Sequence, residues 1–168
     1  MFSYTGGFSV YALINGAKEV TSVDVSSQAL KNAKENANLN SYSGIHKTIT
    51  GDAFEVMKQF ISEDKTFDIV VIDPPSFAKN KKEIIKAKKK YAMLANLGHQ
   101  LTAPKGLLVL SSCSSRILAK EFFNINNEAL KEWHRDYSKL YTSLHDIDHP
   151  VMFEEGAYLK TGFYLFSK

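Results

Sequence analysis

Cysteine is nearly missing from this sequence, because Cys113 is the only one among 168 residues. A single cysteine cannot form a disulfide within the chain, and no Cys/His cluster has the spacing of a zinc site. No apolar run approaches the length of a membrane span, and the amino terminus lacks the basic segment of a signal peptide. We therefore expect a cytoplasmic protein that uses no metal and contacts no membrane.

Internal repeats and low-complexity linkers are also missing, which predicts a single domain over residues 1–168. Hydrophobic residues make up 44% of the chain, a globular composition that excludes a disordered protein. Lys and Arg outnumber Asp and Glu by only 21 to 18, too mild an excess to indicate nucleic acid binding by itself. The lysines concentrate at 79–82 and 86–90, which fits either a solvated helix face or a phosphate-binding surface.

The stretch from Phe67 to Phe77 joins a β-branched apolar run to an acid, two prolines and an aromatic residue. The run is typical of a strand buried on both faces, as in a parallel sheet. Pro74 and Pro75 cannot donate hydrogen bonds to a ladder, so the strand must end before them. Asp73 is therefore predicted at the carboxyl end of a central strand, where open α/β sheets bind ligands. An ordinary strand and turn is the alternative.

A glycine-containing loop, Tyr4-Thr5-Gly6-Gly7-Phe8, precedes an apolar helix that should end at Asn15-Gly16. Glycine lets the backbone take conformations closed to other residues and come close to a ligand. A loop of this kind at the amino end of a helix suits a polar or anionic ligand. The pair of glycines is also common in a plain turn, so the loop alone is a weak signal.

Two further acids follow predicted strands. Asp24 ends the strand at 19–24, about 20 residues after the glycine loop, where dinucleotide-type folds place the acid that binds ribose hydroxyls. Ser26 can cap the helix that comes next. Asp52 lies near the end of a strand predicted at 48–53. It either caps the following helix or contacts a ligand, and the two roles are compatible.

The second half of the chain continues the alternation of helix and strand. The pattern predicts a helix at 83–101, a turn at 104–106, a buried strand at 107–114, a helix at 116–133, and strands at 140–144 and 158–166 joined by a short loop as an antiparallel hairpin. Cys113 follows the apolar part of its strand and stands among serines. An inert core thiol is the default for a lone cysteine, but this position favours a reactive one.

The alternation of strands and helices, with acids at successive strand ends, resembles the class I, Rossmann-like methyltransferase fold. That fold is an α/β sheet that is mostly parallel, with an antiparallel C-terminal hairpin. The motifs resemble more closely the bacterial 23S ribosomal RNA large-subunit cytosine-5 methyltransferases, which depend on S-adenosylmethionine (SAM). The resemblance covers essentially the whole chain, and it rests on residues 2–9, Asp24, Gly51-Asp52-Ala53, Asp73-Pro74-Pro75-Ser76-Phe77, residues 111–114, Asp148-His149-Pro150, Glu155-Gly156 and Tyr158-Leu159-Lys160.

That resemblance implies a cofactor site and a catalytic pair. By resemblance, the SAM site comprises Tyr4, Thr5, Gly6, Gly7, Phe8, Asp24, Val25, Asp52, Ala53, Asp73 and Pro74. Cys113 matches the nucleophile that attacks carbon 6 of cytosine, and Asp73 lies beside both the cofactor and the target base. Addition of a thiolate makes the ring enamine-like, so that carbon 5 can attack an activated methyl group.

Large-subunit ribosomal RNA is the implied partner. A cytosine must be unstacked, or lie in a loop, to reach such a pocket. Phe77 could stack on the base, and Lys79, Lys81 and Lys82 could hold phosphates. Methylation of a base nitrogen, which needs Asp-Pro-Pro-Phe but no cysteine, is the alternative enzyme. A third possibility, which is not an enzyme, is a non-catalytic fragment that binds the cofactor.

Two departures from the family pattern carry expectations of their own. The amino-terminal RNA-binding region and the first core strand, expected just before Phe2, do not precede the glycine loop. That strand belongs in the middle of the sheet, so its neighbours should either pair directly or leave an edge open to self-association. No cysteine follows Pro75, so the base that removes the carbon-5 proton is not a second cysteine.

Overall fold

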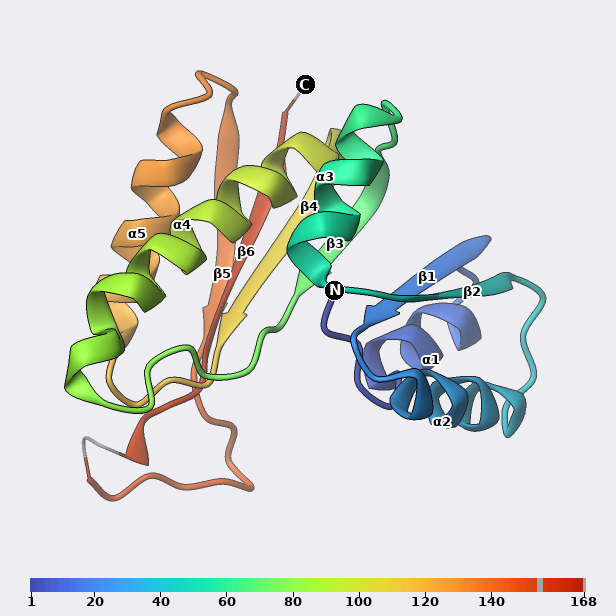
Figure 1. Cartoon of the computed structure of the whole chain (residues 1–168), viewed down its shortest axis with the longest axis horizontal. Coiled ribbons are helices and arrows are strands. Elements are labelled where there is room, and N and C mark those ends of the chain that lie inside the picture. The colour runs from blue at the N-terminus through green and yellow to red at the C-terminus, as the bar shows by residue number, and fades with distance from the viewer. Residues whose placement is uncertain (154–155, 168) are drawn as a thin grey trace. The chain divides into compact units, whose positions relative to one another are not determined.

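The computed structural model describes residues 1–153 and 156–167 (Figure 1). Its contacts divide the chain into two compact units, Met1–Val56 and Met57–Lys168. Each unit has a sheet and helices of its own. Glu155, part of one motif noted in the sequence, lies outside the described residues.

The first unit is built on two parallel strands, β1 (Glu19–Asp24) and β2 (Ile45–Thr50). Helices α1 (Gly7–Ile14) and α2 (Ser27–Asn38) pack on them, and the start of α3 (Ala53–Ser62) completes the unit. Leu13, Val23, Leu30, Ala33 and Ala37 are buried and form its core. The helical spacing of the apolar residues in α2 places them on the face that packs inward.

The ends of these two helices follow the predicted local chemistry. Asn15 is the C-cap of α1, and Gly16 takes a φ of +89°, which glycine adopts without steric strain. The Ser26 hydroxyl accepts a hydrogen bond from the Ala29 N–H at 3.2 Å, so Ser26 caps α2. Both helix boundaries predicted from the sequence are confirmed.

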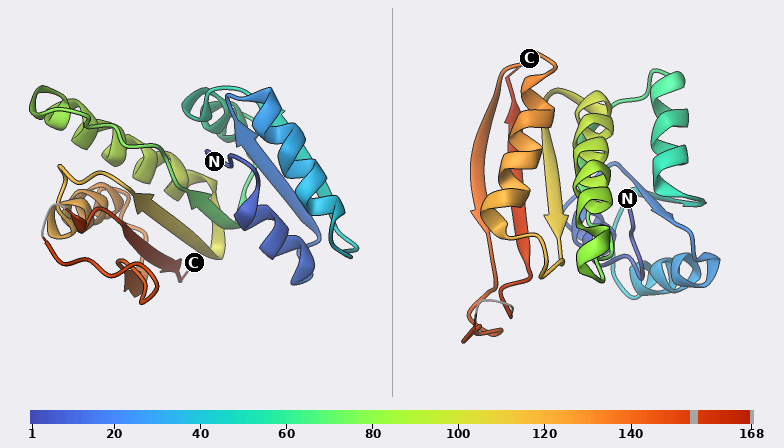
Figure 2. Two further views of the ribbon diagram at one scale, coloured as in Figure 1. Left: turned by 90° about the horizontal axis from the view of Figure 1, so that it is seen from below. Right: turned by 60° about the vertical axis from the view of Figure 1, so that its left-hand side comes forward.

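The second unit contains a four-stranded sheet in the order β3 (Phe67–Ile72), β4 (Thr102–Ser112), β6 (Lys160–Phe166), β5 (Tyr137–Ser143). β3 and β4 are parallel, whereas β6 runs antiparallel to both of its neighbours. The sheet therefore has one reversed strand, which is the antiparallel C-terminal pairing that the sequence predicts. Figure 2 shows this sheet and its helices from two further directions.

The 3-10 turn η1 (Lys81–Glu83) leads into α4 (Ile84–Leu101), and α5 (Ala119–Lys131) follows β4. These two helices lie side by side across one face of the four-stranded sheet (Figures 1 and 2). Buried Tyr91 and Leu94 of α4 and Phe122 of α5 pack in the core. This packing fixes the carboxyl ends of β3 and β4, where the predicted catalytic residues follow.

Several element boundaries differ from the sequence-based ones. β2 begins at Ile45, three residues early, β5 begins at Tyr137, and α5 begins at Ala119. The turn predicted at 104–106 lies inside β4, where the register with β3 shifts between Phe67/Thr102 and Ile69/Leu107. Partner strands supply hydrogen bonds even to polar segments such as 45–47 and 137–139, which hydrophobic periodicity does not detect.

The described strands form two separate sheets, because β1 pairs with β2 alone and β3 with β4 alone. Direct pairing of β1 with β3, one of the two arrangements expected without a preceding core strand, is therefore not observed. The β5–β6 connection, residues 144–159, is longer than the short loop that the sequence suggested. None of the described helices combines the length and the apolar character that a membrane crossing needs.

Candidate functional site

The loop at the start of the first unit depends on Gly6. Its φ is +83°, and an added Cβ would lie 2.8 Å from the Ala33 Cβ of α2. No other residue type fits that conformation and that contact without strain. At Gly7 an added Cβ would meet nothing within 4 Å, so the backbone there borders open space. The loop therefore approaches α2 closely at one glycine and leaves room for a ligand at the next.

Asp24 organises the same loop from the end of β1. One carboxylate oxygen accepts a hydrogen bond from the Tyr4 N–H and the other from the Ser26 N–H, each at 2.9 Å. The Asp24 carbonyl accepts from the Gly51 N–H at 3.0 Å, which joins the ends of β1 and β2. A carboxylate offers about four acceptor positions, so Asp24 keeps capacity for a further donor such as a ribose hydroxyl.

Asp52 is the N-cap of α3. Its Oδ1 accepts hydrogen bonds from the N–H groups of Phe54 and Glu55 at 2.9 and 3.2 Å. The capping role is therefore confirmed, and the adenine-binding role stays a prediction. Ala53, the first residue of α3, is buried. Val25, in contrast, is largely exposed beside Asp24.

The second unit brings Cys113 to the Asp-Pro-Pro turn. β3 and β4 are parallel neighbours, so the segments that follow their carboxyl ends meet at one edge of the sheet. The Cys113 thiol donates to the Pro74 carbonyl oxygen, with 3.8 Å between sulfur and oxygen. Cys113 is half-buried while Ser112 and Ser114 on either side are fully buried. It is therefore not an enclosed core thiol, and it lies beside the Asp-Pro-Pro turn.

Tyr91 contacts Ser112, the residue before Cys113. Tyr91 is not among the site residues that the sequence predicted. The Ser112 hydroxyl donates to the Tyr91 hydroxyl at 2.9 Å, and the Ser114 N–H donates to Ser112 Oγ at 3.2 Å. Burial raises the pKa of Tyr91, so its hydroxyl stays protonated at neutral pH. Tyr91 lies on the inward apolar face of α4, where the sequence indicates only core packing.

The Asp73 carboxyl follows β3 at the same edge of the sheet. Although the residue keeps an exposed surface, the protein around its carboxyl excludes water and raises the pKa above the ordinary value. A carboxyl with a raised pKa takes up a proton more readily and can then donate a hydrogen bond. Such a group suits an acceptor nitrogen of a base.

Phe77 is half-buried and already has partners. Its ring lies 5.1 Å from the Tyr91 ring between centroids, and the Lys90 ammonium lies 4.7 Å from its centroid. The loop that follows is held by Glu83, whose Oε2 accepts from the Lys79 N–H at 2.7 Å. That hydrogen bond lowers the pKa of Glu83. The side chains of the predicted phosphate-binding lysines, Lys79, Lys81 and Lys82, extend from this ordered loop and are exposed.

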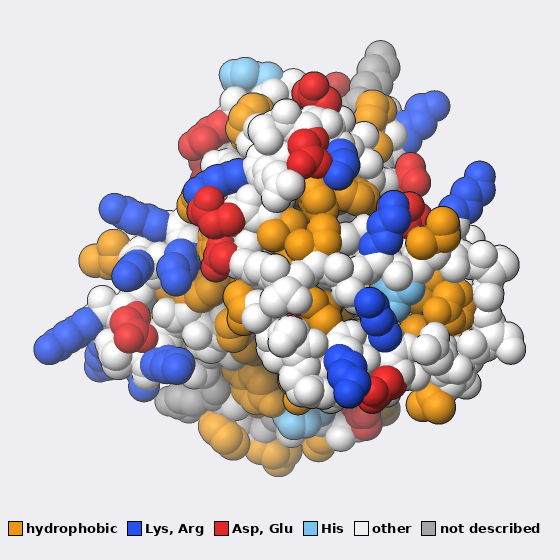
Figure 3. Space-filling view, turned by 45° about the vertical axis from the view of Figure 1, so that its right-hand side comes forward, with side chains coloured by type: hydrophobic (Ala, Val, Ile, Leu, Met, Phe, Trp, Pro, Cys, Tyr) orange, Lys and Arg blue, Asp and Glu red, His pale blue; other side chains and the backbone are white. Residues whose placement is uncertain are grey.

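Surface chemistry gives little further indication of a partner. On the face shown in Figure 3, cationic and anionic side chains are interspersed with hydrophobic ones. Several of the exposed hydrophobic residues belong to the glycine loop and α1, namely Tyr4, Phe8 and Tyr11. Exposed aromatic residues next to a predicted cofactor loop are available to contact a ligand.

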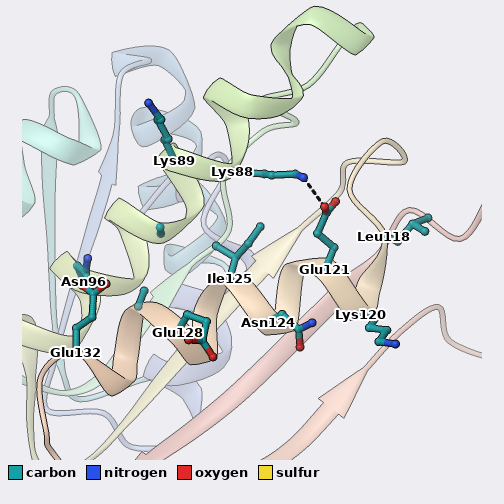
Figure 4. A pocket seen from close by; sticks show the side chains of 12 residues that line it. Lys88, Lys89, Asn96, Leu118, Lys120, Glu121, Asn124, Ile125, Glu128 and Glu132 are labelled. Carbon is teal, nitrogen blue, oxygen red and sulfur yellow. Dashed lines mark ion pairs between the residues drawn. The ribbon is translucent and has the colours of Figure 1, made fainter.

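A groove of about 720 Å³ runs along the outer side of α4 and α5 (Figure 4). Leu118 and Ile125 line it together with lysines and glutamates, and an ion pair between Lys88 and Glu121 bridges the two helices. Its lining includes neither Cys113 nor Asp73. Charges of both signs alternate along it, so the groove indicates no particular ligand.

The order and directions of the strands belong to the class I, Rossmann-like methyltransferase fold. A family model with the description "Conserved hypothetical protein 95" matches residues 1–133, and the chain belongs to that family. It is 41% identical over 163 residues to "Ribosomal RNA large subunit methyltransferase" of Deinococcus radiodurans, a match that covers 96% of this chain and 40% of the relative. It is 40% identical to "Ribosomal RNA large subunit methyltransferase I" of Aeromonas salmonicida, with 95% and 41% covered.

Solved structures agree with this fold. A structure described as a methyltransferase complexed with SAH superposes with a TM-score of 0.82 at 28% identity, over 98% of this chain and 43% of that one. A proposed SAM-dependent methyltransferase from Streptococcus mutans gives 0.83 at 27% identity, over 98% and 43%. The chain thus spans about 40% of the length of the curated relatives that it matches.

Proposed function

We propose that this chain is the catalytic core of a SAM-dependent methyltransferase that acts on large-subunit ribosomal RNA. Relatives at 41% and 40% identity carry that RNA in their names, and a structure with the same fold is described as complexed with SAH. We propose further that the methyl acceptor is carbon 5 of a cytosine and that Cys113 forms the covalent adduct. The observation that carries the finer proposal is the contact of the Cys113 thiol with the Pro74 carbonyl.

The first unit fits the cofactor. Gly6 and Gly7 form a cradle in which one glycine is required by its φ and the next borders open space. The Asp24 carboxylate, fixed by two backbone N–H groups, is oriented to accept ribose hydroxyls. In this proposal Tyr4, Thr5 and Phe8 flank the methionine part, and the turn of Asp52 and Ala53 faces the adenine. SAM supplies an activated methyl group when it is bound.

The residues of the second unit would carry the chemistry on the base. The Cys113 thiolate adds to carbon 6 of cytosine, which makes carbon 5 nucleophilic. Asp73 donates a hydrogen bond to the ring nitrogen and favours that addition. After methyl transfer the proton on carbon 5 passes to solvent, its electron pair re-forms the carbon 5–carbon 6 double bond, and the carbon 6–sulfur bond breaks to release Cys113 as a thiolate. The complete cycle returns the chain to its starting state.

The same unit would hold the RNA. Lys79, Lys81 and Lys82 extend from a loop whose backbone is fixed by Glu83 and Asn80, so they can contact phosphates without ordering the loop first. The Phe77 ring, which is half-buried and contacts Tyr91 and Lys90, can stack on a splayed base. Selection of the target nucleotide belongs to the whole protein, since the relatives are longer than this chain.

A base-nitrogen methyltransferase is the second candidate, because an Asp-Pro-Pro-Phe turn alone suits that chemistry. Cys113→Ala distinguishes the two in a chimera that joins this core to the amino-terminal part of the Deinococcus radiodurans relative. Carbon-5 methylation of ribosomal RNA should vanish in this variant, whereas base-nitrogen methylation should persist. Nucleoside mass spectrometry identifies the product. Calorimetric titration of the chain with SAM tests the third candidate, a non-catalytic fragment that binds the cofactor only weakly.

A further inference from the structure

The one buried cation among the described lysines and arginines is Lys160, the first residue of β6. Only 1% of Lys160 is exposed. Removing an ammonium from water is unfavourable by several kcal/mol unless partners compensate. A lysine that is kept in such a position therefore needs a physical reason, and the reason lies in what surrounds its Nζ.

The ammonium of Lys160 is bound at the turn that carries Cys113. Its Nζ donates hydrogen bonds to the carbonyl oxygen of Ser114, the residue after Cys113, and to that of Tyr158 at 3.0 Å. The strand register adds to this placement, because Lys160 pairs with Ser112, the residue before Cys113. The described residues provide no carboxylate partner for Lys160. The ammonium of Lys160 thus binds the residue after Cys113, and the backbone of Lys160 pairs with the residue before it.

From this geometry we infer that Lys160 is a positioning residue that stabilises the Cys113 thiolate through its place at the Ser114 carbonyl. The inference rests on the proposed function for its catalytic meaning, but the electrostatic link can be measured without RNA or cofactor. Lys160 is fully buried, so a substrate at the surface does not reach it. It therefore acts through Cys113 and the Ser114 carbonyl, and it does not contact the substrate.

The charges around the two residues support the assignment. Burial lowers the pKa of Lys160 to about 8, while attraction from Cys113 raises it. The ammonium and the thiol therefore lie close enough to interact, at the turn where the Lys160 Nζ binds the Ser114 carbonyl. The other titratable groups near Cys113 are Asp73 after β3 and Tyr91 on α4, and both become anionic when they lose a proton.

The loop before β6 fixes the second acceptor of Lys160. The Tyr158 hydroxyl contacts His149 Nε2 at 3.2 Å, and the Leu159 N–H donates to His145 Nε2 at 3.0 Å. The rings of His145 and His149 stack, with 4.9 Å between centroids. The Tyr158 carbonyl is therefore held in place, which keeps the ammonium directed toward the turn of Cys113.

The test is the pH dependence of iodoacetamide alkylation, followed by mass spectrometry on the 168-residue chain. Cys113 is the only cysteine, so the signal has one source. Lys160→Met should move the midpoint of the rate profile upward by about one pH unit, the size expected when a nearby opposite charge is removed. The limiting rate at high pH should stay within about twofold of the wild type, because access to the thiol is unchanged.

Lys139→Met is the matched control, since Lys139 is exposed on the adjacent strand β5. Its profile should overlay that of the wild type, and Lys160→Arg should restore part of the shift. A purely structural role predicts a changed rate at every pH with the midpoint unmoved. A midpoint in Lys160→Met equal to that of the wild type would overturn the inference.

A second measurement needs no change at Lys160 and remains available if Lys160→Met fails to fold. In chain labelled with ¹³C at lysine Cε, the NMR titration of Lys160 should have a lower midpoint in Cys113→Ala than in the wild type. The midpoint is expected to fall because Cys113→Ala removes the thiolate that raises the pKa of Lys160 in the wild type. Equal midpoints would contradict the link. If the link holds but Cys113→Ala still methylates RNA at carbon 5, the proposed function is wrong and the electrostatic pairing stands.

Discussion

The Asp24 carboxylate fixes the Tyr4 N–H at 2.9 Å, across 20 residues of sequence. The acid at the end of β1 therefore shapes the glycine loop before any ligand is bound. A loop that is already ordered binds its ligand with less loss of conformational entropy. Asp24 thus has two roles in the proposed cofactor site, one toward the loop and one toward the ribose.

Replacement of Asp24 by alanine should weaken SAM binding by about 1.5–3 kcal/mol, because a charge-assisted hydrogen bond is lost. Isothermal calorimetry on the chain measures the change. Asp64→Ala is the matched control, since Asp64 follows α3 and has no part in the loop. Binding by Asp24→Ala that equals the wild type within error would remove Asp24 from the cofactor site.

Gly6→Ala should destabilise the chain by more than 1 kcal/mol, since it combines a φ of +83° with a Cβ 2.8 Å from Ala33 Cβ. Gly7→Ala should be close to neutral in stability because nothing lies within 4 Å of its added Cβ. Urea denaturation of both variants gives the comparison. Similar losses in the two variants would show that Gly6 is not the constrained position.

Acid should destabilise the second unit through His99. Its imidazole is buried against Trp133 and Phe166, and burial followed by the charge of Arg135 lowers its pKa from 6.5 to about 4. A lowered folded-state pKa means that the unfolded chain binds more protons between pH 6.5 and 4. Stability is therefore full above pH 6.5 and falls as the pH drops, by on the order of 3 kcal/mol near pH 4.

His99→Phe keeps the aromatic stacking and removes the titrating group, so this part of the acid sensitivity should disappear. His134→Asn, at an exposed histidine with a φ of +50° that asparagine tolerates, is the control and should keep it. Urea denaturation at pH 7 and at pH 4.5 supplies both values. Equal acid sensitivity in His99→Phe and the wild type would contradict the assignment.

The sequence predicts most of the fold because its strands and caps are local signals. The strand before Asp73, the cap at Ser26 and the stop at Asn15-Gly16 each depend on nearby residues, and each is confirmed. The prediction that this strand is central and buried on both faces is wrong, because β3 is the edge strand of the described four-stranded sheet and Ile69 is 61% exposed. The division into two sheets and the bulge in β4 depend on which strands become neighbours, and no local pattern encodes that.

The candidate site was predictable to a similar degree. Cys113 and Pro74 meet because each directly follows one of two parallel strands, a relationship visible in the alternation of strands and helices. Tyr91 and Lys160 were not predictable as parts of the site. A tyrosine on an apolar helix face indicates only core packing, and a lysine at the start of a strand is normally solvated. Only the pairing of β6 with β4 brings Lys160 next to the turn that carries Cys113.

The most direct measurement of the central claim is a covalent adduct with RNA that contains 5-fluorocytosine. Fluorine at carbon 5 prevents the proton loss that releases the cysteine, so the thioether to carbon 6 persists. With SAM and the chimera of this core and the Deinococcus radiodurans amino-terminal part, mass spectrometry should find the adduct on Cys113. It should be absent in Cys113→Ser and present in Ser112→Ala. Two results would contradict the account. One is carbon-5 methylation of RNA by the Cys113→Ala chimera, and the other is methylation by the unchanged chimera with no adduct on 5-fluorocytosine RNA.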